Sequence, residues 1–304
     1  MKNFDLQLFA AAEGVITTVD IEPAISIDCV SRITGNINEL QKVLGIAEMD
    51  AMATGTSIKI YKLACDGLAE QVGEGEEINR TKVTRKLVRT IDLDLNKYRK
   101  TTTAEAIQKV GRNKAINQTD DKVISLIQKD IKSRFYNNAL SVSEDEAGDI
   151  IKVTGTTLQS TLAKAWGKLK NRFADEDVTP IYFVSVDDVA EYLGNAQVTM
   201  QTAFGFSYIE NFLGLGTVVV TPQLAKGVVK ATAKENLHGA YIPMNSGDVA
   251  TTFNLTADTT GYIGMNHTTV PGTATVDTNL MCGVVFYPEF ADGIVEGTIA
   301  PAGA

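Results

Sequence analysis

Side chains capable of acid–base, nucleophilic or metal chemistry are few and scattered in this sequence. It contains two histidines, His238 and His267, and three cysteines, Cys29, Cys65 and Cys282. Because no two cysteines form a C-x-x-C pair, the sequence predicts neither a disulfide framework nor a thiolate zinc site. Neither histidine has neighbours typical of a Ser/His/Asp triad. We therefore expect no nucleophilic catalysis of that kind.

Two acidic segments match cation sites only in part. The motif at 92–96 (DLDLN) opens like a calcium loop, but its sixth position is Lys97 instead of glycine, and its twelfth is Thr103 instead of an acid. The acidic cluster at 144–149 is better explained as a solvated turn. No phosphate-binding glycine loop and no nucleophile elbow occurs. The sequence thus predicts no metal site, no cofactor and no catalytic residue.

A run of basic residues is compatible with nucleic-acid binding. The run consists of Lys82, Arg85, Lys86 and Arg89. Few aromatic residues accompany it, and two aspartates follow at once, whereas a nucleic-acid reader normally presents a denser basic patch. We therefore interpret the run as an ion-pairing surface between protein subunits.

Charge is distributed unevenly along the 304 residues, whose formal net charge is −9. Residues 59–134 carry 17 basic and 11 acidic side chains, whereas residues 175–304 carry 3 basic and 14 acidic ones. Surfaces of opposite charge on one chain can attract each other between copies. No apolar run is long enough to span a bilayer, and the first residues lack the apolar core of a secretory signal.

The basic run lies in a predicted hairpin. Residues 57–63 read as one strand, and residues 83–95 as another, with apolar side chains at alternate positions on one face. The intervening residues 66–80 are rich in glycine and glutamate and read as a solvated tip. Because an isolated hairpin is marginal in water, we expect this one to gain its order from a partner surface.

Two amphipathic helices are predicted after the hairpin. The longer covers residues 119–140, with Thr119 as N-cap and an apolar stripe of Val123, Ile127, Ile131 and Phe135. A shorter helix over 102–112 precedes it and ends at Gly111. The second amphipathic helix covers residues 157–173, with an apolar stripe formed by Leu158, Leu162, Trp166, Leu169 and Phe173.

The remaining elements complete an α+β class. We expect a short helix at 36–44, a buried strand at 180–184, a helix at 186–193 capped by Ser185, and a strand at 216–222. The Thr- and Gly-rich segment 248–278 reads as strand or loop, and 282–287 and 293–299 read as closing strands. Only four of the 21 aromatic residues precede residue 135, so the main core is expected after it.

This order of elements resembles the major capsid protein of tailed bacteriophages. Residues 1–10 (MKNFDLQLFA) are similar to the opening of capsid proteins from phages of Gram-positive hosts. Residues 180–189 (PIYFVSVDDV) look like the strand-then-helix of the family's axial domain. Residues 227–237 (GVVKATAKENL) are similar to a sequence motif that follows a late strand of the family's fold.

The resemblance implies a division of the chain. Residues 1–54 would form an N-terminal arm and 55–101 an extended β-hairpin loop lying over a neighbouring subunit. Residues 102–155 would hold the spine helix of the peripheral domain, 156–280 the axial domain, and 281–304 strands returning to the peripheral domain. Many relatives carry a scaffolding extension before the arm, whereas here the arm-like sequence starts at Met1. Assembly would then use a separate scaffolding protein or no scaffold.

The implied function is structural. Copies would assemble through hexamers and pentamers into an icosahedral head around double-stranded DNA, touched non-specifically at most, with portal and decoration proteins as further partners. The protein would be a virion component assembled in the host cytoplasm, without a membrane or enzymatic role. The expected inter-subunit contacts join Lys82, Arg85, Lys86 and Arg89 to acidic partners Asp187, Asp188 and Glu191. The alternatives are an encapsulin-like nanocompartment of the same fold and a cytosolic enzyme with an unrecognised site.

Overall fold

The computed structural model describes most of the chain after residue 48. The described ranges are 49–66, 80–141, 150–174, 177–194, 200–203, 206–257 and 259–300, with single positions at 37, 38, 41, 42, 44, 46 and 77. Positions 37, 38, 41, 42 and 44 are helical, as expected for the segment 36–44. The opening 1–10 and nearly all of the tip 66–80 lie outside the described residues.

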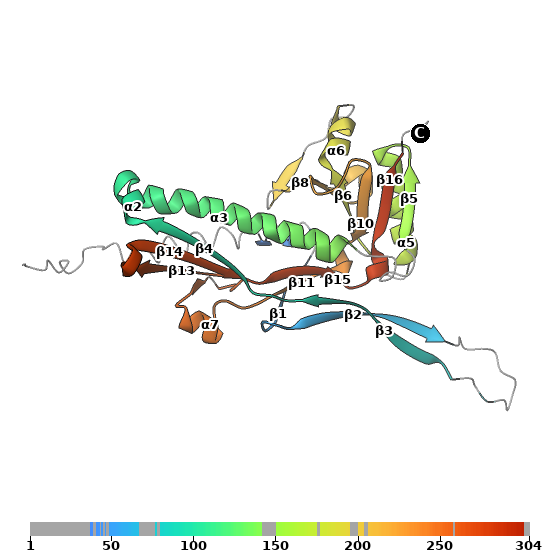
Figure 1. Ribbon diagram of the computed structural model, residues 1–304. Coiled ribbons are helices and arrows are strands. Elements are labelled where there is room, and N and C mark those ends of the chain that lie inside the picture. Colours follow the sequence, from blue (N-terminus) through green and yellow to red (C-terminus); the bar gives the residue numbers. More distant parts are fainter. Residues whose placement is uncertain are drawn as a thin grey trace, which may run out of the picture.

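A long helix packed along a four-stranded sheet forms one half of the molecule (Figure 1). Helix α2 (Ala104–Val110) ends at Gly111, as predicted, and α3 (Arg112–Phe135) continues into a π-helical turn, η1 (Tyr136–Leu140). At 1.5 Å per residue, α3 alone is about 36 Å long. The sheet beside it has the strand order β12 (Thr256–Ala257), β13 (Ile263–Val270), β14 (Thr275–Cys282) and β4 (Asn96–Thr103).

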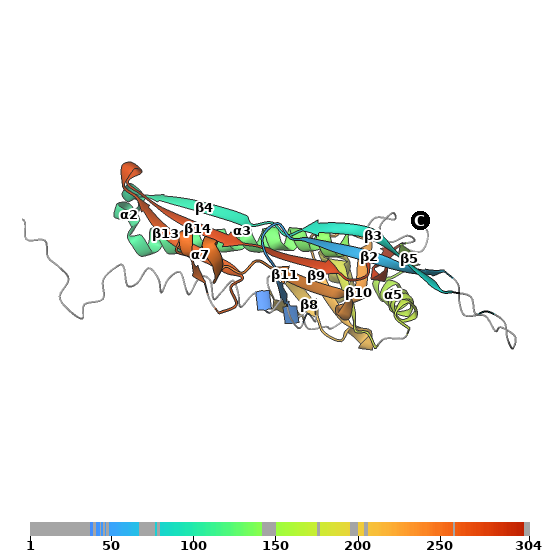
Figure 2. The ribbon, with the colours of Figure 1, turned by 90° about the horizontal axis from the view of Figure 1, so that it is seen from below.

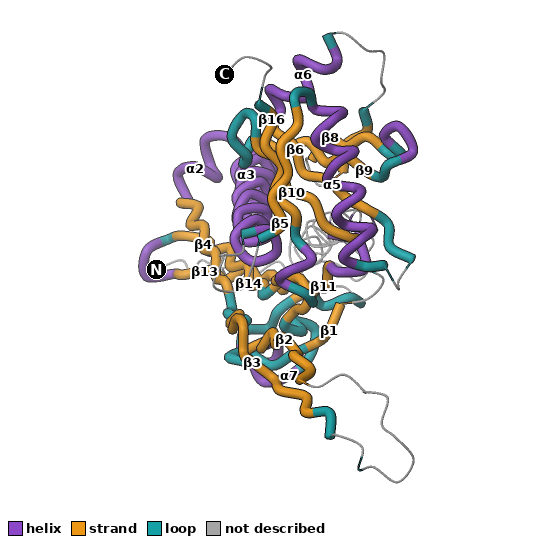
Figure 3. Tube along the Cα trace, turned by 90° about the vertical axis from the view of Figure 1, so that its right-hand side faces the viewer, coloured by secondary structure: helices purple, strands orange, loops and turns teal. Residues whose placement is uncertain are grey.

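A seven-stranded sheet forms the other half, and Figure 3 shows it beside α3, with the predicted hairpin below. Its helices are α5 (Leu158–Arg172) and α6 (Val186–Leu193), whose N-caps Thr157 and Ser185 accept backbone hydrogen bonds from Ser160 and Asp187. The strand order is β5 (Ile151–Gly155), β16 (Val295–Ile299), β10 (Val228–Ala233), β6 (Pro180–Ser185), β9 (Thr217–Thr221), β8 (Phe206–Ile209) and β7 (Gln201–Ala203).

Two smaller sheets complete the fold. A three-stranded sheet has the order β1 (Met49–Ala51), β11 (Leu237–Tyr241) and β15 (Val284–Pro288), and the predicted hairpin is a two-stranded sheet of β2 (Ser57–Asp66) and β3 (Lys82–Asp92). Figure 2 shows the hairpin at the end of the molecule opposite α2. The segment predicted as strand or loop also contains a short helix, α7 (Gly247–Thr252), which the prediction missed.

An aromatic cluster at the end of α3 joins these parts. The Phe135 ring lies 5.5 Å from that of Tyr136, 5.4 Å from Phe183 on β6 and 5.9 Å from Phe286 on β15. Phe135 is fully buried, and so are Ile131 one turn before it and Ile127 two turns before it, which confirms the predicted stripe. One helix face therefore contacts both the seven-stranded and the three-stranded sheet.

The predicted start of the long helix at Thr119 is wrong, because a tertiary ion pair outweighs the local capping signal. The helix starts at Arg112, so Thr119 and Asp120 lie inside it. Asp120 is buried, and its Oδ1 lies 2.5 Å from the Lys100 Nζ on β4. Lys100 also donates hydrogen bonds to the Ile116 carbonyl and the Thr119 hydroxyl. A buried charge needs such a partner, and this one fixes the helix to the sheet.

The predicted stripe of α5 is wrong at one position. Trp166 is 39% exposed, whereas Ala165 beside it is fully buried. Leu158, Leu162 and Leu169 are buried as expected. The small side chain of Ala165 lets the helix approach the sheet closely, and this turns Trp166 toward solvent.

The sheets do not follow the expected ranges of the chain. Within the range 156–280, β13 and most of β14 pair in the sheet beside α3. Within 281–304, β15 joins the three-stranded sheet, whereas β16 pairs with β10 and β5 in the seven-stranded sheet. The division of the chain into these ranges remains a proposal. The chain crosses between the two halves of the molecule more often than the ranges imply.

Substituting the central ring of the cluster should destabilise the protein strongly. We expect Phe135→Ala to lower the free energy of unfolding by about 3–5 kcal/mol, because a fully buried ring leaves a cavity. The matched control Trp166→Ala should cost about 1 kcal/mol or less, since that ring is partly exposed. Denaturant titration of the unassembled chain, followed by circular dichroism, measures both; equal losses would contradict the assigned core.

Acid should weaken the packing of α3 on its sheet. His267 on β13 is opposite Thr278, which is opposite Lys100, so the three side chains share a face. Burial, followed by the charges of Lys100 and Arg112, lowers the pKa of His267 below its usual 6.5, although Asp120 opposes this. The unfolded state therefore binds the proton more readily, and stability falls as the pH drops below about 6.5.

Unfolding titrations between pH 8 and pH 5 measure this effect. We expect His267→Gln to flatten the loss of stability on the acid side relative to the wild type. A slope that is unchanged by His267→Gln would refute the assignment.

Candidate assembly surface

The hairpin changes character along its length because of a β-bulge. Tyr61 on β2 is opposite Leu87 on β3, and the adjacent Ile60 is opposite Arg89, so Val88 is the additional residue. Residues directly opposite each other share a face, and neighbours in a strand point to opposite faces. Leu87 and Arg89 therefore point to opposite faces of the hairpin, although they are two residues apart.

The inner half of the hairpin is anchored in a core. Ile60, Ile91 and Leu93 are buried, and they pack with Ile242 on the segment after β11 and with Val285 on β15. The single apolar face predicted for residues 83–95 is therefore correct only for the residues after the bulge. The alternating pattern could not reveal the bulge. The apolar residues occupy odd positions both before and after Val88, so the sequence looks like one uninterrupted strand with a single apolar face.

The outer half of the hairpin exposes apolar side chains. Val83 is 58% and Leu87 47% exposed, and both lie on the face of Tyr61. The Arg85 guanidinium lies 3.6 Å from the centre of the Tyr61 ring, a cation–π contact on the same face. An apolar and basic strip of this kind is typical of an interaction surface.

The four basic residues proposed from the sequence have different surroundings. Lys82, Arg85 and Lys86 are exposed on the outer half of β3. Arg89 is half-buried and donates hydrogen bonds to the carbonyls of Asn137, Asn138 and Ser141 in its own chain. The first three are therefore exposed, but on both faces of the hairpin: Arg85 shares the face of Tyr61, whereas Lys82 and Lys86 lie on the other face. The fourth lies against the body. A subunit contact for any of them remains a prediction.

The three acidic residues proposed as partners also differ. Asp187 is exposed in the first turn of α6. Asp188 is buried, and its carboxylate accepts a hydrogen bond of 2.8 Å from the Gly227 amide. Glu191 is exposed and lies 3.0 Å from Lys226. Of the three, Asp187 and Glu191 are accessible to a partner, whereas Asp188 is directed toward its own chain.

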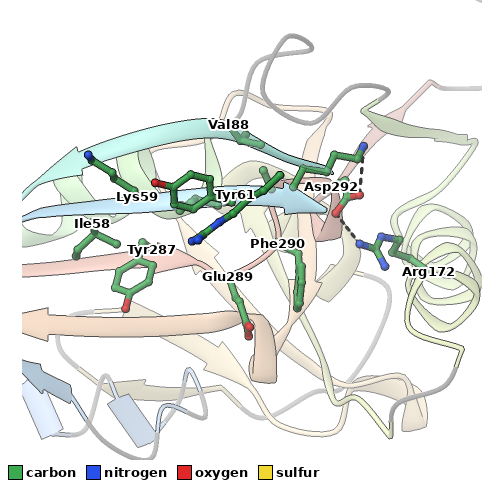
Figure 4. Close-up of a pocket in the computed structure, with 13 residues that line it drawn as sticks. Ile58, Lys59, Tyr61, Val88, Arg172, Tyr287, Glu289, Phe290 and Asp292 are labelled. Carbon is green, nitrogen blue, oxygen red and sulfur yellow. Dashed lines mark hydrogen bonds and ion pairs between the residues drawn. The ribbon is translucent and has the colours of Figure 1, made fainter. Parts of the chain in front are cut away.

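A cleft separates the hairpin from the body of the molecule (Figure 4). Its volume is about 730 Å³, and its walls come from β2, β3, the end of α5 and residues 287–292. Asp292 lies between the two sides, 2.7 Å from Arg172 and 3.6 Å from Lys62 on β2. Sequence reasoning missed Asp292 and Arg172, because 120 residues separate them and neither forms part of a motif.

The lining of the cleft favours an anionic partner with apolar side chains. It contains four basic side chains, Lys59, Lys62, Arg85 and Arg172, and two acidic ones, Glu289 and Asp292. Tyr61 and Phe290 supply aromatic surface, and Figure 4 shows both rings beside the open space. An acidic or amphipathic polypeptide segment fits this combination better than a small metabolite, which would be enclosed more fully.

Cys282 is buried, and His238 contacts residues of its own chain. Burial raises the pKa of the Cys282 thiol to about 12, so it is not a thiolate at neutral pH. The His238 ring lies 3.2 Å from Glu289 and stacks on Tyr287. Among the described residues, no three His, Cys, Asp or Glu side chains are grouped to hold a metal ion. In the same part, no helix is both long and apolar enough to cross a bilayer.

The bulge predicts a contrast between two residues of β3. We expect Ile91→Ala to lower the free energy of unfolding by about 2–4 kcal/mol, because that side chain is only 4% exposed. Leu87→Ala should change it by less than about 0.5 kcal/mol in the unassembled chain. Chemical denaturation of both variants tests the contrast, and a large loss for Leu87→Ala would mean that both faces are buried.

Comparisons with known proteins place this architecture. No protein-family model and no curated protein sequence matches the chain. Among solved structures, the capsid of an empty GTA particle superposes with a TM-score of 0.53 at 10% identity, covering 86% of this chain and 90% of that one. The holo-SrpI encapsulin complex from Synechococcus elongatus gives 0.52 at 9% identity, covering 87% and 89%.

A third structure agrees with these two. The virus-like particle from Pyrococcus furiosus gives a TM-score of 0.51 at 11% identity, covering 88% of this chain and 98% of that one. The identities are low, so the similarity concerns the fold, and it extends over nearly the whole length of each chain. The chain has the α+β fold that phage-type capsid proteins share with encapsulins.

Proposed function

We propose that this chain is a structural shell protein that self-assembles, through hexamers and pentamers, into an icosahedral head enclosing double-stranded DNA. The observation that carries the proposal is the outer half of the hairpin, which exposes Val83 and Leu87 beside basic residues and has no core of its own. Such a surface suits burial against another copy of the chain, whose residues 175–304 carry the opposite charge. The shared fold supports the same role.

The parts of the subunit follow from this proposal. Residues 1–54 serve as an arm, 55–101 as the extended loop, 102–155 as the peripheral domain, 156–280 as the axial domain and 281–304 as returning strands. Lys82, Arg85 and Lys86 contact acidic residues of a neighbouring copy, with Asp187 and Glu191 as the accessible candidates. Individual surface ion pairs stabilise little, but many identical pairs around a shell fix orientation.

The proposal also covers where the particle assembles and which other proteins it contains. The protein is a virion component, assembled in the cytoplasm of a host bacterium, and the segment 1–10 favours a Gram-positive host. Scaffolding, portal and decoration proteins are further partners, and the DNA is contacted without sequence specificity. The protein has no enzymatic role in this proposal.

An encapsulin-like shell is the second candidate, favoured by the similarity to the Synechococcus elongatus complex. The two functions differ in what the particle contains. Particles purified from the native source should contain double-stranded DNA, with high absorbance at 260 nm that nuclease cannot remove. Particles that contain an enzyme and no nucleic acid would support the encapsulin function instead.

Electron microscopy and sedimentation of the purified chain test shell formation itself. We expect closed shells, or rings of five and six subunits. A monomer or dimer that stays small at high concentration, even when the scaffolding protein is supplied, would refute the proposal.

Charge reversal tests the inter-subunit contact. We expect the double variant Arg85→Glu/Lys86→Glu to reduce the yield of shells at least about tenfold at low salt, because like charges then face each other across the interface. The matched control Lys168→Glu reverses an exposed charge on α5 and should assemble normally. Sedimentation measures the yields; equal yields for the double variant and the wild type would exclude this contact.

A further inference from the structure

The long helix ends in a turn with exposed backbone acceptors. After Phe135 the backbone widens into the π-helical turn Tyr136–Leu140. The last carbonyl groups of any helix have no partners within it, and they carry the negative end of the helix dipole. A π-helical turn is rare and often marks a functional position.

Arg89 of the hairpin supplies donors to this turn. One terminal nitrogen of its guanidinium donates to the Asn138 carbonyl at 3.1 Å and the Ser141 carbonyl at 2.9 Å, and the other donates to the Asn137 carbonyl at 2.8 Å. A rigid, permanently charged fork suits several carbonyls at once, and its positive charge complements the helix end. Lysine has no such fork.

The β-bulge is the reason that Arg89 can reach the turn. In a regular strand Arg89 would share the face of Leu87 and Arg85, which is exposed. The additional residue Val88 places Arg89 on the face of Ile60 and Ile91 instead, toward the body of the molecule. Bulges commonly redirect a side chain in this way.

The chain segment that carries Arg89 follows the helix along its length. After β3 it continues into β4, where the Tyr98 hydroxyl donates a hydrogen bond of 2.6 Å to Asp130, and Lys100 pairs with Asp120. Figure 1 shows β4 running beside α3. Residues 89–100 therefore bind the helix just past its C-terminal end, at Asp130 in its last third and at Asp120 in its first half.

We propose that Arg89 is a positioning residue that clamps the hairpin to the C-terminal end of the long helix, so that the direction of the hairpin follows the position of the helix end. The consequence for shells rests on the proposed function, whereas the clamp itself is a property of the single chain. In a shell, the clamp would present the outer half of the hairpin at one angle in every copy. A displacement of either element would be transmitted to the other.

Hydrogen exchange by mass spectrometry on the unassembled full-length chain tests the clamp. Charge-assisted hydrogen bonds stabilise the closed state of the two segments that they join. Their loss in Arg89→Ala should therefore raise the rate of amide exchange about tenfold or more at residues 82–92 and 136–141. Amides 104–115, at the other end of the helices, should be unchanged. Arg89→Lys should give an intermediate rise, and the control Arg85→Ala, a contact within the hairpin, should leave residues 136–141 at the wild-type rate.

Three results would overturn the clamp: a rise spread evenly over the chain, a rise in the hairpin without the helix end, or no rise. Shells then test its consequence, because Arg89→Ala should broaden the distribution of particle diameters, and Arg89→Lys should do so less. Shells of unchanged diameter, despite increased exchange, would refute the role in assembly. If the wild type forms no shells, the proposed function fails and the exchange result still decides the clamp.

Discussion

The outer half of the hairpin has no core of its own, and the account of this protein depends on that constraint. Two strands paired only with each other are marginal in water. Here they also present Val83 and Leu87 to solvent, on the same face as Arg85. Apolar residues of this kind gain stability when another surface covers them, which is why we propose that the hairpin contacts another copy of the chain. The rest of the fold supplies a rigid base for it.

That base is built around one helix. The apolar stripe of α3 ends at Phe135, whose ring contacts Phe183 of the seven-stranded sheet and Phe286 of the three-stranded sheet. Because the helix spans about 36 Å, it connects the aromatic cluster to the distant sheet of β13, β14 and β4. The hairpin leaves this base next to the same cluster. Its direction is therefore tied to the buried aromatic cluster.

Local patterns in the sequence predicted most of the helices, the buried strands at 180–184 and 216–222, the hairpin and the α+β class, because each depends on near neighbours. They did not predict the helix α7 or the strands β10 and β11. They failed where contacts between residues distant in the sequence determine the structure. The start of α3 depends on Lys100 binding Asp120, and Trp166 is turned outward because Ala165 packs on the sheet. The sequence predicted Lys82, Arg85, Lys86 and Arg89 as one contact surface; the first three are exposed, whereas Arg89 is half-buried against its own chain. The sequence did not predict the bulge, because alternation of apolar residues does not report which residue lacks a partner.

The structure of an assembled particle at side-chain resolution, obtained by electron cryomicroscopy, is the sharpest test of the proposed hairpin contact. We expect a closed shell in which the outer half of each hairpin lies on an adjacent copy, with Val83, Leu87 and Arg85 covered by it. A shell whose hairpins point into solvent or fold back on their own subunit would refute the proposal. So would a purified protein that never forms a shell under any assembly condition.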